Sequence, residues 1–213
     1  MGRFKISPVE NAAPSIIPQT ESSANPTIWP KSFPKAVIGI ERDGILIQDN
    51  NFLKYPDQVV PYMDALLAVR DMRKKGYRVI IFTNQPGLML GKLSSKDVDA
   101  VNSRLMQYLG QVGCFSIDGL FYSGSSMSND EYAMPNPGML QKAERELGVD
   151  FSKGYFVGNR LSNMKAGAKM KSKMIFIKTG EYEHELRSVK KAVGIGGRVS
   201  EFNSLTDFAK ILE

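Results

Sequence analysis

Residues 35–49 read KAVIGIERDGILIQD, and this stretch decides the fold. Its apolar, β-branched run, residues 36–40, lies between Pro34 and Gly44. Short apolar runs bounded in this way are typical of buried parallel strands. In open α/β sheets, ligands bind outside the carboxyl ends of the strands. We therefore expect Glu41 and Asp43, which directly follow the run, to lie at a functional edge of a sheet.

The composition is that of a globular protein, with 42% hydrophobic and 23% charged residues. A chain of 213 residues is long enough for one α/β domain and a tail. The single cysteine, Cys114, excludes an intramolecular disulfide, which is typical of a reducing compartment. No apolar run approaches the roughly 20 residues that span a membrane, and no secretory signal is present. We expect no membrane insertion and an intracellular location, in the cytoplasm or an organelle such as the mitochondrion, rather than secretion.

The chain is basic, with a net charge of +6 and a pI near 9.3. Such a charge is compatible with nucleic-acid binding. A mildly basic solvated surface explains it equally, and we favour this interpretation because no lysine and arginine block is interleaved with aromatic residues. A ribonucleoprotein component stays open as an alternative.

Residues 1–34 differ in composition from the rest, since they contain six of the eleven prolines. Proline fixes φ and removes a hydrogen-bond donor, so we predict an extended tail. Its spaced apolar residues, Phe4, Ile16, Ile17 and Trp29, suggest a strap that docks on a protein partner in a larger assembly. The alternative is a leader that is flexible or folds back on its own domain.

Residues 35–213 alternate between strand and helix patterns and form the second predicted unit. Repeated strand–helix units predict a Rossmann-like parallel sheet with right-handed crossovers and helices on both faces. The predicted strands are residues 36–40, 77–82, 117–122, 154–157 and 174–177, and the predicted helices are residues 61–75, 98–108, 136–147, 162–170 and 204–212.

Four motifs occur in order along this unit: IFTNQPGL from residue 81, LGKL from residue 90, PNPGML from residue 135 and YFVGNRLSNMKAG from residue 155. Together with the first strand they resemble the haloacid dehalogenase-like phosphohydrolases. The resemblance is greatest to the branch of histidinol-phosphate and D-glycero-D-manno-heptose bisphosphate phosphatases, and it implies that family's Rossmann-like core.

The resemblance implies roles for five positions. Glu41 stands where the family has its nucleophilic Asp, and Asp43 stands at the general acid/base. Thr83 and Asn84 stand where a hydroxyl and an amide bind phosphate, and the backbone amides after Gly44 complete this phosphate site. Asp43, Gly44, Thr83 and Asn84 are thus the predicted ligand-binding residues.

Other positions depart from the family pattern, which makes the catalytic motifs degenerate. Ile45 replaces a Thr, Met134 replaces the Lys that offsets phosphate charge, and Asn159 and Asn163 replace the two acids that hold Mg²⁺. The branch often carries a zinc loop of Cys and His, but residues 123–132 contain neither. We expect no metal or cofactor, with Mg²⁺ required only if a phosphatase activity survives.

These departures lead to the hypothesis of a catalytically inactive pseudophosphatase. Counting motif positions alone leaves two carboxylates, Glu41 and Asp43, and no lysine, and phosphoryl transfer depends on charge compensation. We expect a structural or adaptor subunit anchored by its tail. The alternatives are a module that binds a phosphorylated metabolite and a weak Mg²⁺-dependent sugar-phosphate phosphatase.

Overall fold

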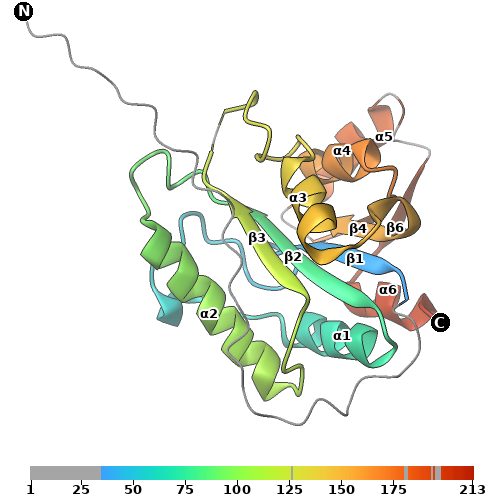
Figure 1. The fold of residues 1–213 in the computed structure, drawn as a ribbon, viewed down its shortest axis with the longest axis horizontal. Helices are drawn as coiled ribbons and strands as arrows, with labels where there is room; N and C mark the ends of the chain where they lie inside the picture. Colours follow the sequence, from blue (N-terminus) through green and yellow to red (C-terminus); the bar gives the residue numbers. More distant parts are fainter. Residues whose placement is uncertain (1–34, 126, 180–181, 193, 195–197) are drawn as a thin grey trace, which may run out of the picture.

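The computed structural model describes residues 35–125, 127–179, 182–192, 194 and 198–213 (Figure 1). The predicted tail, with Phe4, Ile16, Ile17 and Trp29, lies outside the described residues. None of the helices in the described part of the chain combines the length and hydropathy needed to cross a membrane.

The predicted parallel sheet with helices on both faces is confirmed. Within the described part of the chain, six parallel strands form one sheet in the order β3-β2-β1-β4-β5-β6. All five residues of β1 are buried, as expected for a strand between two others in a covered sheet. The strands are β1 (Val37–Glu41), β2 (Arg78–Asn84), β3 (Gly119–Ser123), β4 (Tyr155–Gly158), β5 (Lys173–Ile177) and β6 (Val199–Phe202).

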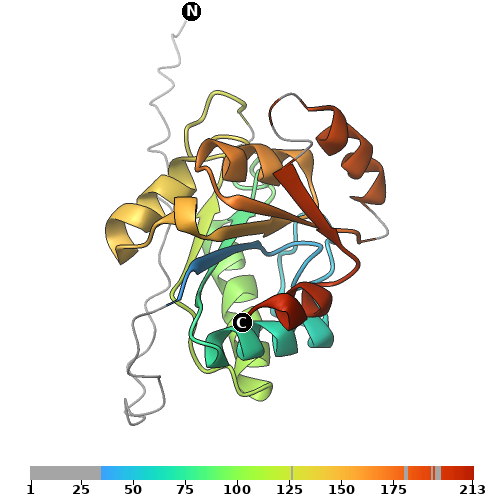
Figure 2. The same cartoon turned by 90° about the vertical axis from the view of Figure 1, so that its right-hand side faces the viewer.

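The helices form two layers, one on each face of the sheet (Figures 1 and 2). One layer holds α1 (Met63–Lys74), α2 (Ser95–Gln111) and α6 (Leu205–Ile211). The other holds α3 (Gly138–Leu147), α4 (Leu161–Lys169) and α5 (Glu183–Lys191). In the described residues, the 3-10 helices η2 (Pro56–Gln58) and η3 (Phe151–Lys153) lie in connections.

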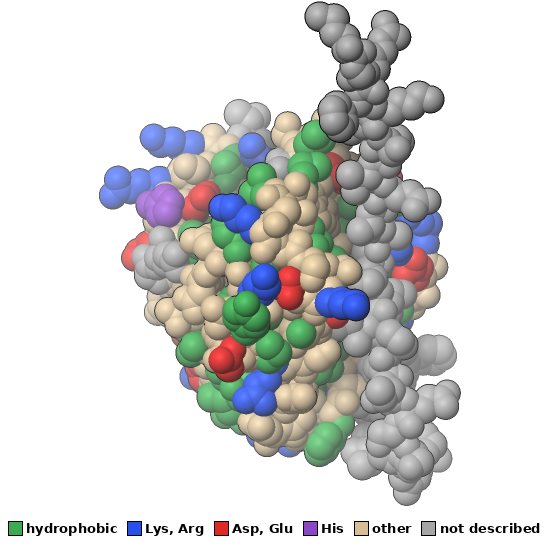
Figure 3. Space-filling model, turned by 90° about the vertical axis from the view of Figure 1, so that its left-hand side faces the viewer, with side chains coloured by type: hydrophobic (Ala, Val, Ile, Leu, Met, Phe, Trp, Pro, Cys, Tyr) green, Lys and Arg blue, Asp and Glu red, His purple; other side chains and the backbone are tan. Residues whose placement is uncertain are grey.

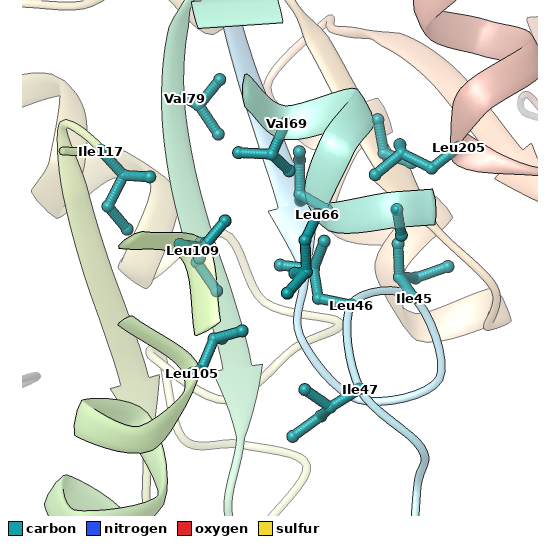
Figure 4. Packing of buried hydrophobic residues seen from close by; sticks show 14 of the residues in the cluster. Ile45, Leu46, Ile47, Leu66, Val69, Val79, Leu105, Leu109, Ile117 and Leu205 are labelled. Atoms are coloured by element: carbon teal, nitrogen blue, oxygen red, sulfur yellow. The ribbon is translucent and has the colours of Figure 1, made fainter. Parts of the chain in front are cut away.

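The larger core cluster lies between the sheet and the first helix layer. Figure 4 shows Leu66 and Val69 of α1, Val79 of β2, and Leu105 and Leu109 of α2 in this cluster, and all five are fully buried. Burying an aliphatic side chain of this size stabilises the fold by about 1.5–3 kcal/mol. The cluster therefore fixes α1 and α2 against the strands that lead to the functional edge.

Aromatic side chains dominate the core under the opposite face of β1 and β2. The Phe82 ring lies 5.7 Å from the Phe121 ring, 5.8 Å from Phe151 and 5.7 Å from Phe156, measured between centroids. Such pairs contribute about 0.5–1.5 kcal/mol each beyond area burial. They tie β2, β3 and β4 together directly beneath the carboxyl ends of the strands.

Helix α5 and strand β6 were not among the predicted elements. Strand β6 is an edge strand whose four residues are only half-buried or exposed, so its sequence lacks an apolar run. Helix α5 buries only Leu186 and Val189. His184 is exposed on this helix.

On the face shown in Figure 3, basic side chains of the described residues are interspersed with acidic and apolar ones.

Candidate functional site

The functional edge is a cavity at the carboxyl ends of β1, β2 and β4. Strand β1 pairs with both β2 and β4, so their last residues end at the same edge of the sheet. The cavity has a volume of about 130 Å³. Predicted site residues that line it are Glu41, Asp43, Asn84, Met134 and Asn163.

Asp43 is held by four hydrogen bonds. The buried Arg42 guanidinium donates from Nε to Oδ1 at 3.1 Å and from Nη2 to Oδ2 at 3.0 Å. Oδ2 also accepts hydrogen bonds from Thr83 Oγ1 and Gln85 Nε2, each at 2.8 Å. Arg42 Nη1 donates to Asn102 Oδ1 at 2.6 Å, which extends the buried network to α2. The charge of Asp43 is therefore matched by a fixed guanidinium, in the two-pronged geometry that arginine favours.

Glu41 lies deeper than Asp43 and is only 5% exposed. Burial raises the pKa of Glu41 to about 8, and the charge of Asp43 acts in the same direction. The positive charges of Arg160 and Arg42 lower this pKa by less. Asn163 Nδ2 donates to Glu41 Oε2 at 2.8 Å. Glu41 is therefore mostly protonated at neutral pH and becomes ionised as the pH rises through about 8.

The two predicted phosphate-binding side chains differ in their placement. Thr83 is fully buried and its hydroxyl donates to Asp43, so it positions that carboxylate. Asn84 lines the cavity, but its amide is paired with the backbone of Met134, donating at 2.9 Å and accepting at 3.1 Å. That both residues contact phosphate stays a prediction.

Asn163 and Asn159 stand at the start of α4. Asn163 Oδ1 accepts hydrogen bonds from the backbone N–H groups of Asn159 at 3.3 Å and of the N-cap residue Arg160 at 3.1 Å, so this third residue of α4 reaches back to the start of the helix. Asn159 Nδ2 donates to Thr179 Oγ1 at 3.2 Å. Asn159 Oδ1 is buried and has no hydrogen-bond partner among the described residues.

These residues do not fit a magnesium ion. Mg²⁺ is usually held by one or two carboxylates in an octahedron of oxygens. Asp43 is engaged by four donors, and Asn163 turns an N–H group toward Glu41. Among these side chains, the oxygens that accept no hydrogen bond from the described residues are Glu41 Oε1 and the buried Asn159 Oδ1, and the latter is neutral. Nor do the described residues contain a group of three or more His, Cys, Asp or Glu side chains that could hold a metal ion.

Hydrogen bonds close the loop at the position of the family's zinc motif. Asn136 Nδ2 donates to the carbonyl oxygens of Ser128 and Asp130, each at 2.8 Å. Asp130 Oδ1 accepts from the backbone N–H of Tyr132 at 2.8 Å. These contacts hold the chain that carries Met134 into the cavity.

Arg160 and Asp49 are cavity residues that the sequence analysis did not single out. Arg160 Nη2 donates to Asp49 Oδ2 and to the Tyr182 hydroxyl oxygen, both at 2.5 Å. The guanidinium lies over the Tyr182 ring, 4.2 Å from its centroid. The sequence signal that could have identified Arg160 is its position directly after Asn159, inside the motif YFVGNRLSNMKAG.

Gly44 is expected to be sensitive to substitution, because its φ is +75° and an added Cβ would lie 2.3 Å from Asn159 Nδ2. Gly44→Ala should lower the free energy of unfolding by about 2–4 kcal/mol, from backbone strain and displacement of Asn159. Urea unfolding measures this change. Gly148→Ala is the matched control, because Gly148 has a φ of +62° and open space around it. Equal losses in the two variants would contradict a tight approach of Asn159 to Gly44.

Comparison with known proteins identifies similar sequences and folds. A family model described as haloacid dehalogenase-like hydrolase matches residues 35–171. The D-glycero-beta-D-manno-heptose-1,7-bisphosphate 7-phosphatase of Pasteurella multocida is 28% identical over 69% of this chain and 84% of its own. The protein of the same name from Haemophilus influenzae is 26% identical over 83% and 96%.

A similar fold occurs in a crystal structure of D,D-heptose 1.7-bisphosphate phosphatase from B. bronchiseptica, complexed with magnesium and phosphate. The TM-score is 0.74 at 24% identity, with 82% of this chain and 96% of that chain covered. At this identity the likeness shows the fold alone.

The prediction of a catalytically inactive adaptor subunit is wrong, because the relatives are named as phosphatases and point to an enzyme. The error has a physical cause. The charge count used only the family's motif positions and found no cation. Two guanidinium groups, Arg42 and Arg160, line the same cavity as Glu41 and Asp43.

Proposed function

Because the chain belongs to the haloacid dehalogenase-like hydrolases, we propose that it hydrolyses a phosphate monoester of a phosphorylated sugar. The observation that carries the proposal is the cavity at the carboxyl ends of the strands, which Glu41, Asp43 and Arg160 all line. Carboxylates supply a nucleophile and a proton path, and a fixed cation compensates phosphate charge. The relatives named as heptose-bisphosphate phosphatases favour a sugar bisphosphate as the substrate.

The proposed reaction uses Glu41 as the nucleophile. Its ionised carboxylate attacks phosphorus, the bond to the sugar oxygen breaks, and that oxygen takes a proton, relayed by Asp43, from the water molecule that is consumed in the second step. Water then attacks the acyl phosphate, which restores the Glu41 carboxylate and releases inorganic phosphate. One water is consumed in each cycle. Because only ionised Glu41 attacks, the rate is expected to increase as the pH rises toward 8.

A substrate panel tests the proposal. Phosphate release is measured with D-glycero-D-manno-heptose 1,7-bisphosphate, sugar monophosphates, nucleotides and phosphoserine. We expect the sugar bisphosphate to have the highest kcat/KM, by about tenfold or more, because a second phosphate adds binding contacts. Binding of the bisphosphate without any release of phosphate would contradict hydrolysis and leave a metabolite-binding module.

We also propose that residues 1–34 bind a protein partner, with the spaced apolar residues of that segment as the support. Deleting residues 1–33 is expected to abolish co-purification of the partner while phosphate release stays unchanged, since the cavity is built from residues 41–163. Affinity purification of the full and shortened chains, compared by mass spectrometry, measures this. An unchanged set of co-purifying proteins would contradict it.

A further inference from the structure

The altered motif positions provide no positive charge for binding a phosphate group in the cavity. A phosphate monoester carries up to two negative charges, so a site that binds it needs cations or strong donors. Met134 offers a thioether in place of a lysine, and Asn159 and Asn163 are neutral. The cations that line the cavity are Arg42 and Arg160.

Arg42 is already committed to neighbouring groups. Its Nε and Nη2 are bonded to Asp43 and its Nη1 to Asn102, and the side chain is 1% exposed. Moving it toward a ligand would leave the Asp43 carboxylate without its counter-charge in a poorly solvated place, which is costly. Arg42 therefore neutralises Asp43 and does not serve a ligand.

Arg160 differs from Arg42, because the contacts that hold its guanidinium leave some of its N–H donors without a partner in the described residues. All of its side-chain hydrogen bonds to described residues come from Nη2, to Asp49 and Tyr182. Nε and Nη1 make none within the described chain, and the ring of Tyr182 supports one face of the guanidinium. The side chain is part-buried and lines the cavity, close enough to Glu41 for its charge to act there. An anchored guanidinium with two donor positions to spare has the geometry that binds phosphate oxygens.

We propose that the Arg160 guanidinium, and not a divalent metal ion, is the cation that binds the substrate phosphate in this cavity. The proposal rests on the proposed function, since it concerns the same site. Asp49 and Tyr182 act as positioning residues that fix the guanidinium. The hydrogen bonds that occupy Asp43 and turn an Asn163 N–H group toward Glu41 leave, among these side chains in the described residues, Glu41 Oε1 and the neutral Asn159 Oδ1, which is too few oxygens to form the octahedron that Mg²⁺ requires.

The test is binding of inorganic phosphate to the full-length protein, followed by isothermal titration calorimetry in EDTA and again in excess MgCl₂. We expect the Kd to agree within about twofold between the two buffers, because the cation is part of the chain. Arg160→Gln is expected to weaken binding by about tenfold or more, as the loss of a charge-assisted contact does. The Kd of Arg160→Lys should lie between those of the unaltered protein and Arg160→Gln, because lysine keeps the charge and lacks the planar guanidinium.

Arg187→Gln is the matched control, since it removes the same charge from an exposed position on the neighbouring helix α5. Its Kd should equal that of the unaltered protein. Thermal unfolding of each variant checks that it is folded. If Arg160→Gln does not fold, the Kd of Arg160→Lys tests the proposal in its place. Binding that requires MgCl₂, or an Arg160→Gln variant that binds normally, would overturn this inference alone. No phosphate binding in either buffer would overturn the proposed function as well.

Discussion

Arg42→Met is expected to lower the free energy of unfolding by about 3–5 kcal/mol, the cost of removing one partner of a buried ion pair. Arg42 is among the largest fully buried side chains of the described residues. Its loss would leave Asp43 with two hydrogen bonds and no counter-charge, and would leave Asn102 Oδ1 without its donor. Urea unfolding at neutral pH measures the change.

The double variant Arg42→Met/Asp43→Asn separates charge from packing. Removing both charges should recover a large part of the loss, because the methionine fills much of the buried volume and no carboxylate is left uncompensated. The free energy of unfolding of Arg42→Lys is expected to lie between those of Arg42→Met and the unaltered chain. A loss below about 1 kcal/mol for Arg42→Met would mean that the pair contributes no more than an exposed salt bridge does.

Glu41→Gln is expected to stabilise the protein at pH 8 by about 3–5 kcal/mol and to have little effect near pH 5. Burial raises the pKa of Glu41 from 4.5 to about 8. Between these two values the unfolded chain has lost this proton and the folded chain keeps it, so stability falls as the pH rises. Glutamine stays neutral and can accept the hydrogen bond from Asn163, so the variant lacks this decline.

Thermal or urea unfolding across this pH range measures the difference between the two proteins. The control is Glu183→Gln, which alters an exposed carboxyl group on α5 and should leave the pH dependence as it is in the unaltered chain. Parallel stability curves for the Glu41→Gln variant and the unaltered protein would show that Glu41 ionises in the folded state as readily as in the unfolded chain.

The sequence predicted those elements whose signals are local. Residues 36–40 form a continuous apolar run, and the structure has strand β1 there. Helix α2 begins three residues before the predicted residue 98, where the Ser94 side chain caps it by accepting a hydrogen bond from the Asp97 N–H. Strand β6 was missed because an edge strand needs little apolar surface. Its own residues therefore carry no pattern that predicts its pairing with β5.

The carboxylates and asparagines of the site could be placed together from the parallel topology alone, but the role of Arg42 could not. Neighbouring residues of a strand point to opposite faces, which predicts that Arg42 and Asp43 diverge. The chain turns immediately after β1, with the Arg42 carbonyl accepting the Leu46 N–H at 2.9 Å and Gly44 at a φ of +75°. This turn brings Asp43 back onto the guanidinium.

Arg160 was missed for a different reason. Its partners Asp49 and Tyr182 are 111 and 22 residues away along the chain. Only the folded sheet brings the three together, and no spacing in the sequence marks them as a group. A count of charges at the motif positions that the resemblance implies therefore gave the wrong functional prediction.

The most direct test of the central claim is the initial rate of phosphate release from D-glycero-D-manno-heptose 1,7-bisphosphate, compared between the unaltered chain and Glu41→Gln. The measurement is made at about one pH unit above the pKa of Glu41, where its carboxylate is ionised. We predict release by the unaltered chain and a loss of about 10³-fold or more in the variant, since removing a nucleophile abolishes the attacking step. Equal rates in the two proteins, or no release by the unaltered chain, would contradict a phosphatase that works through Glu41.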